Sequence, residues 1–347
     1  MAEPTSIVIP AYNQLDYCRQ CIQSIHQHTR ADYRLILVDN GSTDGVSEFF
    51  DHVTGAEVIH SATNLGFAGG VNLGIQRAMG HVLLLNSDTL VVPGWFERLE
   101  AALAQADTIG IVGPRTNYAS GYQQIDGLSF ASYDEIAEFA RKLAEEHAGT
   151  LTDVPRLIGF CMLIRDRVIR DVGLFDETFG VGMYEDDDYG LRARRAGYRL
   201  CVAEDAFVFH YGNRTFAGMG IVEDKWHALM AENEHRFSEK WQGIAEQESR
   251  QLNADAHAAL AEGKTAEALR LLMQAVDACP GLGVNHNDLG AILWGLGEHE
   301  RAFDCFARAI RLKPGYEEAR ANLIDVARAT GRMAQAEALL SGNDDDL

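Results

Sequence analysis

The run MYEDDDYGLRARRAGYRL contains the residues best suited to move a proton, because four acids, Glu185 to Asp188, follow one another directly. The basic residues Arg192, Arg194 and Arg195 come one to two turns later, which predicts a helix that begins with the acids. A helix dipole favours acids in its first turn, but four packed carboxylates also repel one another. Such neighbours raise one another's pKa, and a carboxylate with a raised pKa is suited to act as a general base.

A second candidate site follows the apolar run VLLL, where Asn86, Ser87 and Asp88 come directly after a predicted buried strand. A carboxylate at the end of such a strand can hold a divalent cation against a diphosphate. The alternative is that this carboxylate caps the helix predicted at PGWFERL. His210 ends another apolar strand, in VFHYGNRTF, where a lone histidine is more often structural.

Three further polar patches follow apolar runs. VIPAYN exposes Asn13 in a turn, which is otherwise an ordinary strand-to-helix connection. LVDNGSTDG delivers Asp39 to a sheet edge, where it can accept hydrogen bonds from a ribose or a base, unless the segment is a turn in which Ser42 or Thr43 caps the next helix. In NLGFAGGVNLG the glycines allow a close approach of backbone to a ligand, although their spacing is not that of a dinucleotide fingerprint. The polar and glycine positions of interest there are Asn64, Gly66, Gly69, Gly70 and Asn72.

These patches need a scaffold, and residues 5–211 alternate short apolar runs with helical stretches. SIVIP, RLILVDN, EVIH and HVLLLN are predicted to be strands, with helices between them. This alternation is typical of an α/β domain whose mostly parallel sheet is covered by helices on both faces. Ligands bind in such sheets at the carboxyl ends of the strands. Several of the polar patches fall at those ends.

The strand signals stop near residue 222, and the chain continues with a long helical stretch and a repeat. Residues 223–252 are predicted to form a connecting helix. Residues 253–341 repeat with a period of 34, which Gly263, Gly297 and Gly331 mark, and this period indicates three stacked helical hairpins. The acidic end, residues 342–347, is predicted to be a solvated tail.

Composition narrows the class of partner, because the chain of 347 residues has a formal net charge of -21. Nucleic acid and anionic membranes both need a basic face, so we expect neither as a main partner. The sequence has no run of 18 apolar residues and no basic, apolar leader, so we expect neither a transmembrane segment nor export. Six cysteines are too sparse for a secreted disulfide scaffold, which favours the cytoplasm. Cys18 and Cys21 form a CxxC pair on a predicted amphipathic helix, where we expect a structural role.

Taken together, VIPAYN, LVDNGSTDG, NLGFAGG, LLNSDT, EDDDYGLR and HYGNRTF resemble, in order and spacing, the family 2 glycosyltransferases with a GT-A fold. The branch they resemble most contains rhamnosyltransferase-like and galactofuranosyltransferase-like enzymes. The likeness covers about residues 5–216, so residues 1–222 are predicted to be the GT-A domain. The 34-residue units resemble tetratricopeptide repeats, most fully around Gly290, Ala302 and Pro314. The predicted fold class is therefore an α/β GT-A domain followed by an all-α tetratricopeptide array.

The resemblance implies roles for the residues singled out above. It places a nucleotide-sugar donor, a UDP- or dTDP-sugar, against Pro10, Ala11, Tyr12, Asn13, Asp39, Asn64, Gly70, Asn72, Asn86, Ser87 and Asp88. The last three occupy the position of the family's DxD motif, from which this chain departs because Asn86 replaces the first acid. Asp88 and His210 would hold Mn²⁺ or Mg²⁺. Asp186, with Glu185 beside it, takes the place of the catalytic base, and the implied reaction is an inverting in-line displacement.

Other functions fit the sequence less well. A sugar nucleotidyltransferase would carry a glycine-rich GTRL-like loop after its first strand, where this chain has PAYNQLD. An inactive scaffold would have no need for Asp88, Asp186 and His210 together. The acceptor is open, because polysaccharide and O-antigen intermediates are common in the family whereas the repeats point to a protein acceptor or partner. The repeats could also serve assembly alone, including a homo-oligomer.

Overall fold

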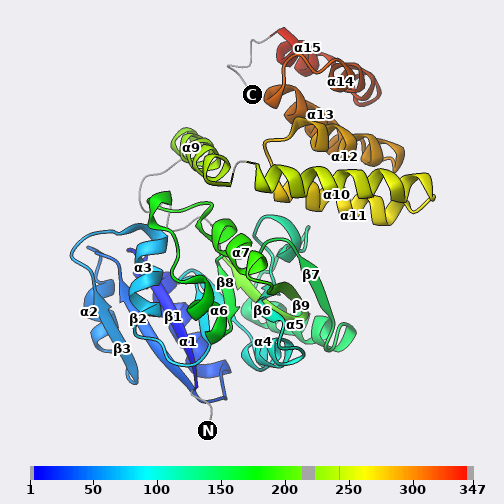
Figure 1. Ribbon diagram of the computed structural model, residues 1–347. Helices are drawn as coiled ribbons and strands as arrows, with labels where there is room; N and C mark the ends of the chain where they lie inside the picture. The colour runs from blue at the N-terminus through cyan, green and yellow to red at the C-terminus, as the bar shows by residue number, and fades with distance from the viewer. Residues whose placement is uncertain (1–3, 213–222, 242, 342–347) are drawn as a thin grey trace. The chain divides into compact units, whose positions relative to one another are not determined.

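The structure is a computed structural model that describes residues 4–212, 223–241 and 243–341. Its internal contacts divide the chain into two compact units, Met1–Arg236 and Phe237–Leu347, and each is described by itself (Figure 1). The division falls inside a helix, whereas we expected the first domain to end at residue 222 and a connecting helix to follow. The predicted acidic tail, 342–347, lies outside the described residues.

The first unit is built on a sheet with the strand order β3-β2-β1-β4-β8-β6-β9-β5, in which β7 pairs with β9. The strands are β1 (Thr5–Ala11), β2 (Tyr33–Asp39), β3 (Ala56–His60), β4 (Val82–Leu85), β5 (Thr89–Val91), β6 (Ile109–Arg115), β7 (Leu151–Val154), β8 (Cys161–Ile164) and β9 (Arg199–His210). The helices are α1 (Leu15–His28), α2 (Val46–Asp51), α3 (Gly66–Ile75), α4 (Trp95–Ala104), α5 (Tyr133–Glu146), α6 (Asp166–Val172), α7 (Glu185–Arg195) and the start of α9 (Glu223–Trp241).

The prediction of a mostly parallel sheet is right for one half of the sheet and wrong for the other. β3, β2, β1 and β4 are parallel to one another. β8 is antiparallel to both β4 and β6, and β9 is antiparallel to β5 and β7 while parallel to β6. The apolar runs did not reveal this difference, because a strand buried on both faces reads as a continuous apolar run in either direction.

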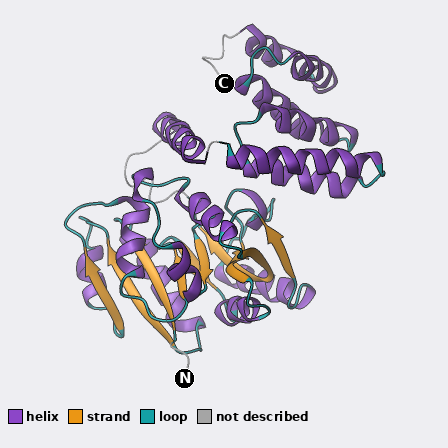
Figure 2. Ribbon diagram, in the orientation of Figure 1, coloured by secondary structure: helices purple, strands orange, loops and turns teal. Residues whose placement is uncertain are grey.

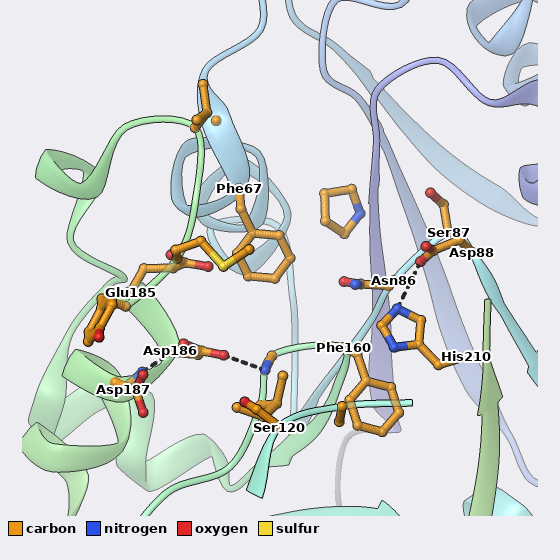
Figure 3. A pocket seen from close by; sticks show the side chains of 18 of the residues that line it. Phe67, Asn86, Ser87, Asp88, Ser120, Phe160, Glu185, Asp186, Asp187 and His210 are labelled. Atoms are coloured by element: carbon orange, nitrogen blue, oxygen red, sulfur yellow. Dashed lines mark hydrogen bonds and ion pairs between the residues drawn. The ribbon is translucent and has the colours of Figure 1, made fainter. Parts of the chain in front are cut away.

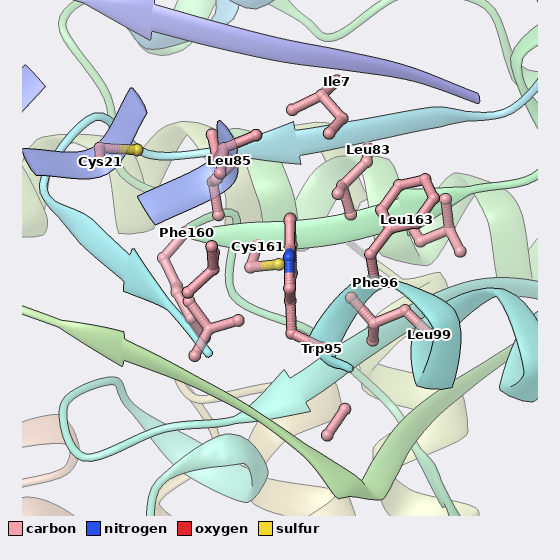
Figure 4. Close-up of a cluster of buried hydrophobic side chains, with 14 of the residues drawn as sticks. Ile7, Cys21, Leu83, Leu85, Trp95, Phe96, Leu99, Phe160, Cys161 and Leu163 are labelled. Atoms are coloured by element: carbon pink, nitrogen blue, oxygen red, sulfur yellow. The ribbon is translucent and has the colours of Figure 1, made fainter. Parts of the chain in front are cut away.

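Helices cover both faces of this sheet, as we expected (Figure 2). Successive side chains of a strand point to opposite faces, so Ile7 and Ile9 of β1 enter one apolar cluster and Val8 enters the other. Figure 4 shows the first cluster, where Trp95 of α4 packs among side chains of β4 and β8. The two buried clusters fix the strands, and the strands fix the loops that follow them.

The cysteines of the first unit are buried and free. Cys18 and Cys21 lie on the inner side of α1, which confirms that the CxxC segment is an amphipathic helix. Burial raises the pKa of the Cys21 thiol to about 12 and, assisted by Asp153, that of Cys201 to about 12 as well. Cys279 and Cys305, in the second unit, are half-buried.

The second unit consists of paired helices, which are α10 (Ile244–Ala261), α11 (Thr265–Ala278), α12 (Gly283–Gly295), α13 (His299–Leu312), α14 (Glu317–Thr330) and α15 (Met333–Ser341). Gly263, Gly297 and Gly331 turn the chain within each pair, with φ of 76°, 83° and 73°. The helix predicted over 223–252 is two helices, because α9 ends at Trp241 and α10 runs on to Ala261. Across the described ranges, none of the helices has the length and apolar character needed to cross a membrane.

Candidate active site

A cavity of about 610 Å³ lies at the carboxyl ends of β1, β2 and β4. Three neighbouring parallel strands end at the same sheet edge, so the residues that follow them gather there. Ten of the predicted site residues line this cavity, namely Pro10, Ala11, Tyr12, Asn64, Asn86, Ser87, Asp88, Glu185, Asp186 and His210. Figure 3 shows Asp88 and His210 on one side and the acids of α7 on the other.

Asp88 and His210 are far apart in sequence and are brought together by the pairing of β5 with β9. Thr89 lies opposite His210 in the antiparallel register, and the backbone N–H of Tyr211 donates to the carbonyl of Asp88 at 3.0 Å. The Nε2 atom of His210 lies 3.3 Å from Oδ1 of Asp88, and both side chains are almost fully buried. Asp88 therefore does not cap a helix, because a strand follows it.

The surroundings of His210 fix which of its ring nitrogens faces Asp88. Nδ1 lies 2.8 Å from the carbonyl oxygen of Tyr118, which can only accept, so Nδ1 carries a hydrogen. The side chain of Asn117 holds the His210 backbone through both its N–H and its carbonyl, and the Phe160 ring stacks on the imidazole at 5.0 Å. Nε2, the other ring nitrogen, faces a carboxylate oxygen, an arrangement that calls for a proton or a cation between the two atoms.

The four acids of α7 have different surroundings, although they are adjacent in sequence. Oδ2 of Asp186 accepts the N–H of Gly159 at 2.8 Å, and its Oδ1 accepts the N–H of Asp187 at 2.9 Å. Asp187 pairs with Arg156 at 3.0 Å and Asp188 with Arg192 at 2.8 Å, so both of these carboxylates face a guanidinium.

The sequence predicted raised pKa values in this run of acids, and Glu185 has such a shift. Burial of the side chain, with the negative charge of Asp186 beside it as a smaller cause, raises the pKa of the Glu185 carboxyl well above its usual range. Among the described residues, its Oε2 atom is buried without a hydrogen-bond partner. Burial, and to a smaller extent repulsion from Asp186, therefore favours the protonated form of Glu185.

The loop before α7 has an unusual backbone. Gly180, Gly182, Met183 and Tyr184 all have positive φ, of 66°, 144°, 78° and 75°. This region is open to glycine but costly for residues with a β-carbon, so Met183 and Tyr184 adopt it only because their surroundings impose it. The loop turns the chain directly into Glu185 and Asp186.

Four residues that we expected to contact the donor do not line the cavity. Asp39 accepts the N–H of Ser42 and contacts His60, and the Asn13 side chain accepts the N–H of Thr43. Both ends of the Asn72 amide bind residues 175–177, and so join α3 to the segment before α7. A β-carbon on Gly70 would meet the side chains of Asn40 and Pro10, so this glycine lies just behind the cavity wall.

The sequence did not single out several residues that line the cavity. Asn40 links β2 to α3, because it donates to Asn64 and to the carbonyl of Gly66 and accepts the N–H of Leu65. Its place beside Asp39 in LVDNGSTDG was the available signal. Gly66, Phe67, Met183, Tyr184 and Asp187 lie within the quoted motifs, but the sequence assigned them no contact with the donor or acceptor. The others come from segments that carry no motif, and they are Tyr118, Ala119, Ser120, Gln124, Arg156, Ile158, Gly159, Phe160, Val181, Trp226 and Met230.

The sheet, with a cavity at the carboxyl ends of its parallel strands, is typical of an α/β domain that binds a ligand there. Comparison with known proteins supports the same class of domain. Residues 6–173 match the model of glycosyl transferase family 2, and residues 293–342 match that of a tetratricopeptide repeat. An uncharacterized protein of Mycobacterium tuberculosis is 30% identical over 217 residues, which are 60% of this chain and 74% of that protein. The chain belongs to glycosyltransferase family 2, and tetratricopeptide repeats follow its GT-A domain.

Other similar proteins include glycosyltransferase AglE of Haloferax volcanii, which is 26% identical over 59% of this chain and 66% of its own length. The uncharacterized protein y4gI of Sinorhizobium fredii is 26% identical, and the chain spans only 24% of its length. Among solved structures, the mannosyltransferase PcManGT from Pyrobaculum calidifontis has a TM-score of 0.46 at 15% identity, over 100% of this chain and 89% of that chain.

Proposed function

We propose that this protein transfers a sugar from a nucleoside diphosphate to an acceptor hydroxyl, with inversion at the anomeric carbon. The observation that carries the proposal is the placement of two chemically distinct groups in one cavity (Figure 3). Asp186 lies on one side as a proton acceptor, and the pair of Asp88 and His210 lies on the other, where a diphosphate would leave.

The donor would occupy the part of the cavity formed by Pro10–Tyr12, Asn40, Asn64 and Asn86–Asp88. These residues offer amides, hydroxyls and backbone groups and, apart from Asp88, no negative charge, so they suit a nucleoside and its sugar. The glycine-rich segment NLGFAGG, which leads into α3, favours a dTDP-rhamnose or a UDP-hexose. We keep both donors in the proposal.

A divalent cation, Mn²⁺ or Mg²⁺, fits between Asp88 and His210. Carboxylate oxygen and imidazole nitrogen are ligands of such ions, and two ligands at about 2.1 Å and at right angles would be about 3.0 Å apart. The 3.3 Å between Nε2 and Oδ1 is close to that value. Within the described ranges no group of three or more His, Cys, Asp and Glu side chains could hold a metal, so diphosphate and water would supply the remaining ligands. A bound cation would stabilise the charge of the departing diphosphate.

Asp186 would take the acceptor proton as the new bond forms. The acceptor oxygen attacks the anomeric carbon and loses its proton to Asp186, while the bond from that carbon to the diphosphate breaks and its electrons leave with the diphosphate. Each carboxylate oxygen of Asp186 accepts one backbone N–H and keeps a lone pair for this proton. Burial raises the pKa of the Glu185 carboxyl, and in its neutral form this group is suited to donate a hydrogen bond to a substrate oxygen.

The acceptor is a hydroxyl on a glycan or on a protein. We favour protein involvement, because a tetratricopeptide array is a surface that binds peptides or proteins. Assembly of a polysaccharide, with repeats that serve only to hold copies of the enzyme together, is the second candidate. An inactive scaffold is disfavoured by the joint placement of Asp88, Asp186 and His210 around one cavity.

Asp186→Asn tests the proposed base, with Glu185→Gln as its matched control. The amide keeps the shape of the carboxylate but cannot take the proton, so turnover should fall by about 10²- to 10⁴-fold. Titration with UDP and dTDP by calorimetry should show nucleotide affinity within about threefold of wild type, because ΔΔG below about 0.7 kcal/mol is expected for an isosteric change outside the donor contacts. Glu185→Gln mimics the neutral acid and should cost less than about 10-fold. A crippled Glu185→Gln with a nearly active Asp186→Asn would show that the base is misassigned.

A further inference from the structure

One face of α9 belongs to the cavity, although this helix follows the family motifs in sequence. Trp226 and Met230 line the cavity, and Asn233 is fully buried. These three residues are spaced by four and three positions, which places them on the same side of a helix. The first part of α9 also belongs to the same compact unit as the sheet. The helix is therefore part of the wall of the enzyme unit.

Asn233 binds the loop that precedes α7. Its Nδ2 atom donates to the carbonyl oxygens of Phe179, Gly182 and Met183, at 2.9, 2.8 and 3.1 Å. One turn later, the guanidinium of Arg236 donates to the carbonyl of Thr178. Carbonyl oxygens can only accept, so a donor is required at position 233, and an aspartate of the same shape would face three lone pairs.

This loop is the segment with four positive φ angles, and α3 packs against its other side. The N–H of Phe67 donates to the carbonyl of Val181 at 3.2 Å. A β-carbon on Gly66 would lie 1.9 Å from the carbonyl oxygen of Gly180, so backbone packs directly on backbone here. A strained conformation persists only when its surroundings determine it fully. Asn233 on one side and α3 on the other provide those surroundings.

The loop in turn sets the position of Asp186. Tyr184 is the last residue with positive φ, and its carbonyl accepts the N–H of Asp188 in the first turn of α7. Any relaxation of residues 180–184 would therefore shift the start of α7, including the carboxylate that must meet the acceptor hydroxyl. A displacement of about 1 Å at a reacting group can lower a rate by about 10²-fold.

We propose that Asn233 is a positioning residue for catalysis, which holds the strained loop of residues 179–184 so that Asp186 meets the acceptor oxygen. The inference rests on the proposed function, since it needs Asp186 as the base. Asn233 touches neither reacting atom and acts only through the loop. It extends the enzyme's machinery to a helix that lies beyond the residues matched by the family model.

Asn233→Ala and Asn233→Asp in the full chain test this role, with kcat and donor KM measured separately. The probe is release of nucleoside diphosphate from the UDP- or dTDP-sugar that the wild-type chain turns over fastest. Both variants should lower kcat by about 10- to 100-fold and leave the donor KM within about twofold, because the donor contacts lie elsewhere. Thr29→Val is the control, since it removes another buried hydrogen bond of this unit, from Trp95 Nε1 at 3.0 Å, and should leave kcat unchanged.

A double variant separates positioning from a general loss of stability. If Asn233 acts through Asp186, adding Asn233→Ala to Asp186→Asn should lower the residual rate by less than about twofold, whereas independent effects would multiply. Multiplied effects, an unchanged kcat in both Asn233 variants, or an equal loss in Thr29→Val would each overturn the proposal and leave the base assignment standing. A nearly active Asp186→Asn would instead overturn the base assignment, and the positioning role with it.

Discussion

At the scale of single residues, the contact between His210 and Asp88 indicates where a cation would bind. Tyr118 accepts the hydrogen of Nδ1, so the other ring nitrogen, Nε2, faces Oδ1 of Asp88 at 3.3 Å, and a proton or a cation is needed between these two atoms. In the GT-A sites that this chain resembles, the first acid of the DxD motif would share the cation, and here that residue is Asn86. The cation would therefore depend on two protein ligands, and we expect it to bind more weakly than to a site with two carboxylates.

Removal of the metal is expected to abolish turnover. Excess EDTA should stop release of the nucleoside diphosphate, and Mn²⁺ or Mg²⁺ should restore it. Asp88→Ala and His210→Ala should each raise the metal concentration that gives half-maximal rate by at least about 10-fold, because each removes one of two protein ligands. His52→Ala is the control, since this exposed histidine lies at the end of α2, where its ring hydrogen-bonds the carbonyl of Glu48. Undiminished turnover in excess chelator would remove the metal from the mechanism.

Single residues were predictable from sequence to different degrees. Asp88, Asp186 and His210 were named from their motifs, and all three line the cavity. LVDNGSTDG gave the correct neighbourhood but not the correct side chain, because Asp39 folds back onto Ser42 whereas Asn40 crosses to α3. A motif locates a turn, but the direction of each side chain in that turn depends on contacts from elsewhere in the chain.

At the scale of elements, the shortest strand has the largest effect on the site. β5 has only three residues, Thr89–Val91, which is too few to show a period, so its pairing with β9 could not be read from the sequence. That pairing nevertheless brings Asp88 to His210. The parallel half of the sheet was easier to predict, because β1, β2 and β3 are each followed directly by a helix.

The packing of α3 on β1 depends on the absence of a side chain at Gly74. A β-carbon there would lie 2.2 Å from Cγ1 of Val8, which is fully buried in the sheet. Gly74→Ala should therefore destabilise the first unit by about 1–3 kcal/mol, as overpacking usually does. Thermal unfolding would measure this loss. Gly295→Ala, at the end of α12 with no atom within 4 Å of the new carbon, should cost nothing, and an equal loss in both variants would contradict the packing argument.

At the scale of the whole molecule, the sequence and the structure differ on where the enzyme unit ends and the unit with the repeats begins. The motifs stop near residue 216, so the sequence placed the end of the domain at 222, but the compact unit extends to Arg236. The additional residues belong to α9, and a helix without motif residues gives no sign in the sequence that it completes a cavity. The roles of Trp226, Met230 and Asn233 follow from their contacts in the structure, which the sequence does not show.

Two shortened chains test this boundary. A chain that ends after Trp241 keeps α9 and should release nucleoside diphosphate at close to the full-length rate. A chain that ends at residue 222 lacks the α9 side chains of the cavity wall and should lose at least about 10-fold in turnover, because the loop before Asp186 is no longer held. Circular dichroism checks that both chains fold. Equal rates would place α9 outside the enzyme.

The longer of the two chains also addresses the repeats. If they recruit the acceptor, it should hydrolyse the donor but fail to transfer to the physiological acceptor. If they only join copies of the protein, it should become monomeric in light scattering. Normal transfer with an unchanged oligomeric state would leave the repeats without either role.

The distribution of buried thiols gives the wild-type protein a built-in label site. Cys18, Cys21, Cys161 and Cys201 have almost no exposed surface, and burial raises the pKa of each, so a maleimide dye has neither access nor thiolate to react with. Cys279 and Cys305 belong to the repeats and keep part of their surface exposed, although burial raises the pKa of both thiols and brings that of Cys305 to about 11. A fluorophore attached to the native protein would thus report on the repeats alone, and anisotropy or energy transfer could follow their partners without any engineered cysteine.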